Sequence, residues 1–294
     1  MRIFLTGATG FIGSALVPEL IQAGHQVVGV TRSDAGAEAL AAAGVEVYRG
    51  TLEDPEGLRA GAAKAEAVIH TAFDHDFSRF AENCEKDRRV IAALGQALAG
   101  SDRPLVITSG TGMGAAGHGE LAVEDVFNPS HPNPRVASEL AGNALLEAGI
   151  NVSVMRLPQV HDTVKQGLIS PLVEIARQKG VSAYVGEGRN RFAAGHLLDV
   201  ARLYRLAVEK RQPGARYHAV GEEGVEVRAI AEALGRGLTL PVVSIAPEKA
   251  AEHFGWMAMF APMDLPVSSA LTQARLGWHP TGPTLIADLD AMRY

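Results

Sequence analysis

The feature of the sequence that most constrains the fold is a glycine-spaced turn near the N-terminus. An apolar run at residues 3–5 leads into Gly7, Gly10 and Gly13, and an apolar helix pattern follows. The unpaired N–H groups and positive dipole end of a helix N-terminus bind pyrophosphate. Gly7 can turn sharply, Gly10 lets a phosphate approach, and Gly13 lets the helix pack on the strand. The turn therefore predicts a dinucleotide site, although its G-x-x-G-x-x-G spacing differs from the common G-x-G-x-x-G. The alternative is a tight turn that binds nothing.

Strand and helix patterns alternate through the first half of the chain. Strands are predicted at 26–30, 45–48, 67–70, 105–108 and 152–156, and helices at 14–23, 35–43, 56–63, 76–99 and 138–148. Such alternation indicates an α/β fold with helices on both faces of a parallel sheet. We therefore expect a Rossmann-type, doubly wound parallel sheet with right-handed crossovers.

The regular alternation weakens after Pro158, where helices are predicted at 168–179, 199–209, 227–235 and 247–254, and a strand at 217–220. We expect residues 1–158 to form a dinucleotide-binding domain to which 195–221 return. Residues 159–194 and 222–294 are then expected to form a smaller C-terminal substrate-binding domain. That domain would close over the carboxyl ends of the strands, where open parallel sheets bind ligands.

Composition narrows the set of partners. The formal net charge is -6 and no basic block is present, which argues against nucleic acid. No apolar stretch reaches the ~20 residues of a membrane helix, so no membrane partner is expected. The single cysteine, Cys84, suits a reducing cytoplasm. No histidine or carboxylate spacing indicates a metal site. An apolar cluster at residues 254–263 could wall a substrate pocket, belong to the core or support a homodimer.

The end of the second predicted strand bears on the choice of cofactor. A carboxylate there would bind the ribose of NAD, whereas an arginine accommodates the 2′-phosphate of NADP. The chain has no acid at Thr31, and Arg32 and Ser33 offer a cation and a hydroxyl. This favours NADP, with NAD possible because Asp34 could reach the ribose from a bent loop. Arg32 could also be a solvated surface residue.

Residues 7–13 resemble the signature of extended and atypical short-chain dehydrogenases/reductases, the superfamily that includes sugar-nucleotide epimerases. Segments 50–54, 70–72, 108–111, 156–161 and 196–201 agree with this resemblance. It implies an NAD(P)-dependent enzyme in which 50–54 contact adenine, 70–72 the ribose and pyrophosphate, and Pro158 the nicotinamide side. Together with the residues discussed above, the expected cofactor-binding residues are Gly7, Thr9, Gly10, Phe11, Ile12, Gly13, Arg32, Ser33, Thr51, Leu52, His70, Thr71, Ala72 and Pro158.

The chain departs from the family at the residues that carry its chemistry. The superfamily generally uses a tyrosine and a lysine four residues apart on one helix as its proton relay. The matching positions here hold Arg135 and Glu139, and no Tyr-x-x-x-Lys occurs in the sequence. Residues at i and i+4 share a helix face, so an Arg135–Glu139 ion pair is the expected arrangement.

Other groups would then have to handle the proton. Ser109 and Thr111 lie where a substrate oxygen is expected, while His161 and His131 titrate in a useful range. Arg135 could polarise a carbonyl as a fixed cation, and water could supply the proton. We therefore expect an oxidoreductase acting on a small carbonyl or alcohol. The alternatives are a non-catalytic dinucleotide sensor or scaffold and a sugar-nucleotide epimerase or dehydratase.

Overall fold

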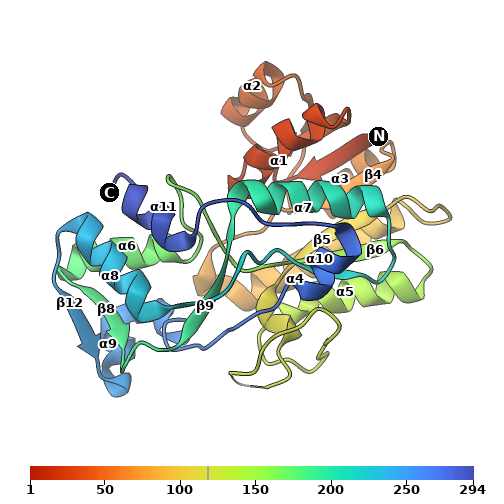
Figure 1. Cartoon of the computed structure of the whole chain (residues 1–294). Coiled ribbons are helices and arrows are strands. Elements are labelled where there is room, and N and C mark those ends of the chain that lie inside the picture. The colour runs from red at the N-terminus through yellow and green to blue at the C-terminus, as the bar shows by residue number, and fades with distance from the viewer. Residues whose placement is uncertain (118) are drawn as a thin grey trace.

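The computed structural model describes residues 1–117 and 119–294, and its centre is a parallel sheet of seven strands. The strand order is β10-β6-β5-β4-β1-β2-β3, and all neighbours run parallel. Figure 1 labels β4, β5 and β6 of this sheet. The strands are β1 (Arg2–Thr6), β2 (Gln26–Thr31), β3 (Glu46–Arg49), β4 (Ala67–His70), β5 (Leu105–Gly110), β6 (Val152–Leu157) and β10 (Arg216–His218). The order reverses between β1 and β4, and open α/β sheets bind ligands beside such a reversal.

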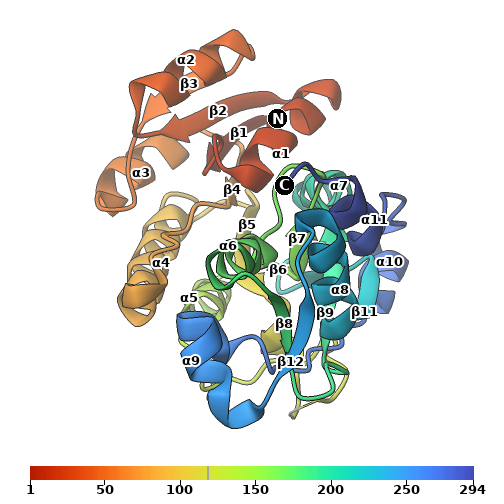
Figure 2. The same ribbon diagram turned by 90° about the vertical axis from the view of Figure 1, so that its left-hand side faces the viewer.

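Helices cover both faces of this sheet because the side chains of its strands alternate in direction. Ile3 and Leu5 join a buried cluster with α1 (Phe11–Gln22), α2 (Asp34–Ala42) and α7 (Leu197–Lys210). Phe4 points to the opposite cluster, with α3 (Pro55–Ala62), α4 (Phe80–Gln96) and α5 (Val136–Glu147) (Figure 2). The predicted Rossmann-type α/β fold is confirmed.

The later part of the chain builds a smaller body beside the sheet. It contains a sheet of β7 (Gln159–His161), β9 (Arg191–His196) and β11 (Glu222–Glu226), and a pair of β8 (Ser182–Val185) and β12 (Val242–Ile245). Side chains of β8, β9, β11 and β12 share a third core with α6 (Ile169–Lys179), α8 (Val227–Leu238), α9 (Ala250–Phe254) and α11 (Leu285–Ala291). Another helix, α10 (Ala270–Leu276), lies against β10 and α7. The domain boundaries given above stay a prediction.

Two predicted helices are interrupted. The helix expected at 76–99 begins as a 3₁₀ turn, η1 (Phe77–Arg79), because the Asp76 carboxylate accepts a hydrogen bond from Ser78 N at 3.1 Å. The helix expected at 247–254 likewise starts with η3 (Pro247–Lys249), and η4 (Gly255–Met259) follows α9. In the described ranges, no helix is both long and apolar enough to cross a membrane.

Candidate active site

The turn between β1 and α1 brings backbone into close contact. Gly7 has a φ of +70°, and a Cβ there would lie 2.7 Å from Thr71 Oγ1 and 2.8 Å from Ala72 N. A Cβ at Gly13 would lie 2.0 Å from the carbonyl oxygen of Gly7. Gly10 N closes the turn by donating to that same carbonyl at 2.8 Å. The turn therefore packs against the segment that follows β4, and side chains are excluded at its first and last glycines.

Gly10 has a different role, because the packing of the chain does not require it to be glycine. A Cβ there would meet only the Gly7 carbonyl, at 3.1 Å, and Thr9 and Gly10 are exposed. Gly10 is the N-cap of α1 and provides no side-chain cap for the first-turn N–H groups. Open N–H groups on a bare backbone suit a diphosphate. Thr9 and Gly10, with Phe11 and Ile12, would hold the pyrophosphate of a dinucleotide.

Two arginines lie near the expected ribose site, Arg32 directly after β2 and Arg49 at the end of the neighbouring strand β3. Arg32 is exposed and forms no ion pair in the described part of the chain. Ser33 caps α2 by accepting a hydrogen bond from Gly36 N at 3.1 Å. Asp34, the competing carboxylate, pairs with Arg49 at 2.8 Å, and Arg49 also donates to the Ser33 carbonyl. Arg49 was not among the predicted site residues. It pairs with Asp34, while Arg32 is exposed to solvent.

The contact of His70 with a cofactor stays a prediction, and its side chain has partners within the protein. His70 is fully buried, with Nδ1 2.7 Å from Thr6 Oγ1 and Nε2 2.9 Å from Asp87 Oδ1. Its imidazole therefore ties β4 to β1 and α4 rather than facing the carboxyl edge of the sheet.

The other expected cofactor residues lie along the same edge of the sheet. Thr71 Oγ1 donates to the Thr6 carbonyl at 2.8 Å, and Ala72 follows it against the glycine turn. Thr51 and Leu52 follow β3, and Pro158 stands between β6 and β7. Their contacts with a cofactor stay predictions.

The predicted ion pair between Arg135 and Glu139 does not form, because each residue has another partner. Arg135 instead reaches buried Asp87, with Nη1 2.6 Å from Oδ2, and donates to the Thr108 carbonyl at 2.8 Å. Ser138 Oγ also hydrogen-bonds Asp87, at 2.5 Å. Burial acts against ionisation of Asp87, but Arg135, His70 and Ser138 outweigh it and hold its pKa below the usual value. Arg135 is thus locked to α4 and β5 by opposite charge and hydrogen bonds.

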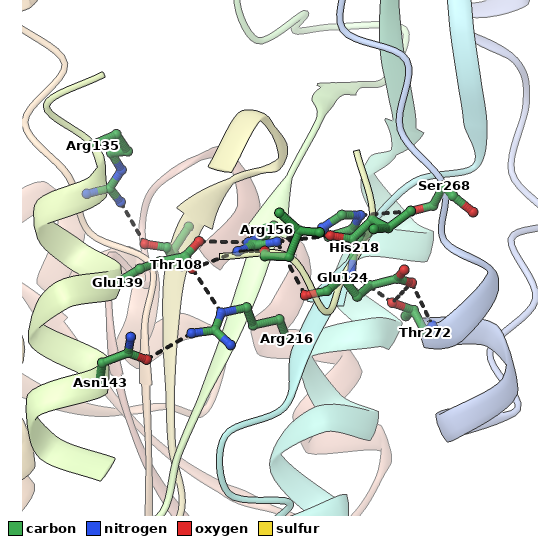
Figure 3. A network of polar contacts seen from close by, with 12 residues as sticks. Thr108, Glu124, Arg135, Glu139, Asn143, Arg156, Arg216, His218, Ser268 and Thr272 are labelled. Atoms are coloured by element: carbon green, nitrogen blue, oxygen red, sulfur yellow. Dashed lines mark hydrogen bonds and ion pairs between the residues drawn. The ribbon is translucent and has the colours of Figure 1, made fainter. Parts of the chain in front are cut away.

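Glu139 belongs to a second buried network, which Figure 3 shows beside Arg135. Its carboxylate accepts from Arg156 Nε at 2.7 Å and Nη2 at 2.8 Å, and from Arg216 Nε at 3.0 Å. The side chains of Glu139 and Arg156 are both 0% exposed. Burial opposes the charged form, yet the two arginines lower the pKa of Glu139. The residue at the family's lysine position is therefore a structural anion.

The network continues into the C-terminal segments. Arg156 Nη1 lies 3.2 Å from His218 Nε2, and His218 Nδ1 lies 2.8 Å from the Ser268 carbonyl. Burial and the charge of Arg156 lower the pKa of His218, so its imidazole is neutral. Glu124 accepts from Thr272 N at 2.7 Å and Oγ1 at 2.8 Å. These contacts join α5, β6, β10 and the start of α10.

The two hydroxyls expected to orient a substrate have different surroundings. Ser109 is buried on β5, and its hydroxyl helps to lower the pKa of Glu139, so it faces the α5 side of the sheet. Thr111 is the first residue of η2 (Thr111–Gly114), directly beyond β5 at the carboxyl edge. Thr111 is thus better placed than Ser109 for a substrate oxygen, and both assignments stay predictions.

Both predicted proton donors have protein partners. His161 is buried, with Nδ1 2.7 Å from Asp288 on α11, and burial lowers its pKa despite that carboxylate. His131 lies in a loop, where its Nδ1 accepts from Asn133 N at 3.1 Å. The structure does not bring these histidines together with Ser109 and Thr111 through any hydrogen bond in the described residues.

A match to a known family agrees with this geometry. The profile of the NAD dependent epimerase/dehydratase family matches residues 3–220. The chain therefore belongs to that family, within the extended short-chain dehydrogenase/reductase superfamily. A dTDP-glucose 4,6-dehydratase from Streptomyces venezuelae, solved with NAD bound, shares the fold with a TM-score of 0.78 and 19% identity. The likeness covers 100% of this chain and 96% of that one.

Relatives in sequence include an uncharacterised yeast protein and a bacterial reductase. An uncharacterised protein of Schizosaccharomyces pombe is 46% identical over 100% of both chains. A 2-alkyl-3-oxoalkanoate reductase of Stenotrophomonas maltophilia is 30% identical, over 73% of this chain and 67% of the reductase. Enzymatic activity of the present chain is thus inferred at the level of the family.

Proposed function

We propose that this protein is an NADP-preferring oxidoreductase that transfers a hydride between a nicotinamide cofactor and a small carbonyl or alcohol. The observation that carries the proposal is the glycine turn. Its exposed Gly10 and uncapped first-turn N–H groups suit a diphosphate, and they lie at the carboxyl edge of the sheet. The similarity to an oxoalkanoate reductase supports a carbonyl substrate. The exposed Arg32 supports NADP, since arginine suits a 2′-phosphate.

The bound nicotinamide would supply or accept the hydride, and the residues of this chain would do the rest. We assign Thr111 to hydrogen-bond the substrate oxygen, with Ser109 as its alternative. Arg135 is held on Asp87 and Thr108, so its charge is fixed beside the site rather than free to follow a substrate. An atypical group must therefore transfer the proton.

A sugar-nucleotide epimerase or dehydratase is the second candidate, because the family and the Streptomyces dehydratase favour it. Such enzymes depend on the tyrosine that Arg135 replaces, so we rank this function lower. A dinucleotide sensor is the non-catalytic alternative, favoured by the engagement of Arg135 and Glu139 in structural networks.

Four further expectations belong to this proposal. The substrate is a small molecule, and the protein works in the cytoplasm. Burial raises the pKa of the Cys84 thiol to about 11, which suits an unreactive thiol. Exposed Trp256 and Met259 could join two copies as a homodimer.

The test is oxidation of NADPH in the presence of a panel of ketones and quinones. We expect turnover with at least one carbonyl and weaker activity with NADH. Tight binding of NADPH without turnover of any carbonyl would support the sensor instead.

A further inference from the structure

The segment after β4 passes through the centre of the proposed site. In the sheet order, β4 lies between β1, which leads into the glycine turn, and β5, which leads into Thr111. The segment starts against the glycine turn, since a Cβ on Gly7 would lie 2.8 Å from Ala72 N. His75 follows three residues later and is exposed. The segment that carries His75 thus leaves the carboxyl edge of the sheet between the strands that lead to the glycine turn and to Thr111.

Ring contacts connect His75 to the residue at the family's tyrosine position. The guanidinium carbon of Arg135 lies 4.2 Å from the centroid of the Phe73 ring. The His75 ring packs edge-on against the same Phe73 ring, with centroids 5.4 Å apart. His75 also contacts Phe77, with ring centroids 6.1 Å apart, and Phe77 stacks on Trp256 of η4 at 4.7 Å. The Phe73 ring therefore contacts both Arg135 and His75, and the imidazole packs against two aromatic rings.

The charges that face His75 come from three elements. Arg135 precedes α5, Lys165 lies between β7 and α6, and Asp74 belongs to the same segment as His75. Lys165 Nζ lies 5.6 Å from the ring of Phe11, the first residue of α1, so it stands over the glycine turn. Asp74 is engaged by Lys86 at 2.9 Å. Two cations therefore act on His75, while its neighbouring carboxylate is already paired.

These charges set the protonation state of His75. Although His75 is exposed overall, the groups packed around its imidazole desolvate the ring and lower its pKa below the ordinary 6.5. Arg135 and Lys165 lower the pKa further, while hydrogen bonding to the Phe73 backbone and the charge of Asp74 act in the opposite direction. At neutral pH the imidazole is mostly uncharged. It can then accept a proton during alcohol oxidation, and its protonated fraction increases as the pH falls.

We propose that His75, rather than His161 or His131, exchanges the proton with the substrate oxygen. This assignment rests on the proposed function. In the reductive direction, the carbonyl carbon takes a hydride, and with it two electrons, from the reduced nicotinamide cofactor, which becomes oxidised. The C=O π bond breaks, and its electron pair takes the proton from protonated His75 to form the O–H bond. Neutral His75 then regains a proton from solvent, and the alcohol oxidation reverses each step.

The test compares His75→Gln with His279→Gln, which changes an exposed histidine on the segment after α10. The Kd for NADPH and the single-turnover rate of carbonyl reduction are measured between pH 5 and 8. A general acid contributes roughly 10²–10⁴-fold. We expect His75→Gln to lose about that factor while its Kd for NADPH stays within about twofold of the parent value. In the parent, reduction should speed up as the pH falls, and this dependence should disappear in His75→Gln but persist in His279→Gln.

A second variant distinguishes a role of His75 in proton transfer from a role in packing. In His75→Ala, added imidazole should restore part of the reduction rate, which a loss of packing would not allow. If the parent is active and His75→Gln keeps its rate and pH profile, the assignment of His75 is wrong and the proposed function stands. A parent that binds NADPH but reduces no carbonyl overturns the proposed function, and the assignment with it.

Discussion

Replacing Glu139 by glutamine removes a buried negative charge that binds two arginines. The carboxylate accepts bonds of 2.7 and 2.8 Å from Arg156 and 3.0 Å from Arg216. Arg156 is 0% exposed, so water cannot take the place of the lost carboxylate. Removing one partner of a buried ion pair costs about 3–5 kcal/mol, because the other charge stays buried without a partner. We expect Glu139→Gln to lower the free energy of unfolding by about that amount.

The assay is urea unfolding followed by circular dichroism, with Glu46→Gln as the matched control. Glu46 pairs with Arg2 at 2.7 Å, but the Glu46 side chain is 62% exposed. Exposed pairs are worth about 0–1 kcal/mol, so the control should change little. At roughly 2–4 °C per kcal/mol for a large domain, Glu139→Gln should also lower Tm by about 6–20 °C.

The pH dependence of the free energy of unfolding tests the same ion pair independently. Because the folded-state pKa of Glu139 lies below the ordinary value of 4.5, its contribution to stability is present above that value. The contribution is lost as the pH falls through the lower folded-state pKa. The parent should therefore lose its advantage over Glu139→Gln in acid. If Glu139→Gln unfolds at the same urea concentration as Glu46→Gln at pH 7, the buried ion pair does not stabilise the fold as expected.

Three other predictions test the cofactor site and the histidines. Gly10→Val should abolish tight NADPH binding in a calorimetric titration, because the side chain fills the space left for a phosphate; binding as tight as in the parent would place the site elsewhere. Arg32→Ala should weaken NADP binding about tenfold or more, since a hydrogen bond to a charged group is worth about 1.5–3 kcal/mol, and should leave NAD binding nearly unchanged; equal losses would contradict the assignment. His161→Gln and His131→Gln should keep the parent's pH profile for carbonyl reduction, and a lost acidic limb in either would make that histidine the proton donor.

Much of the fold could be predicted because strand and helix patterns alternate regularly in the first half of the chain, as they do in the structure. The strand predicted at 67–70 is β4 itself, and the helix predicted at 14–23 overlaps α1. The strands of the smaller body were not predicted, namely β7, β8, β9, β11 and β12. In this part of the chain, strands and helices do not alternate regularly, so no repeated order marks these strands.

The site was harder to predict because its partners are distant in sequence. The i, i+4 spacing pointed to an Arg135–Glu139 pair, but tertiary contacts gave each residue a stronger, buried partner. Asp87 lies 48 residues from Arg135, and Arg156 lies 17 residues from Glu139. No sequence motif links Asp87 to Arg135 or Arg156 to Glu139. His75 was missed because its significance depends on Phe73 and Arg135 packing beside it, which only the folded chain shows.

The central claim is hydride transfer from a bound nicotinamide cofactor to a carbonyl, and isotope transfer tests it most directly. The protein is incubated with NADPH carrying deuterium at the transferable C4 position and with the carbonyl panel, and the products are analysed by mass spectrometry. The account predicts an alcohol with one deuterium on the former carbonyl carbon, formed in step with oxidation of the cofactor. Bound NADPH that stays reduced and fully labelled with every carbonyl would contradict the account.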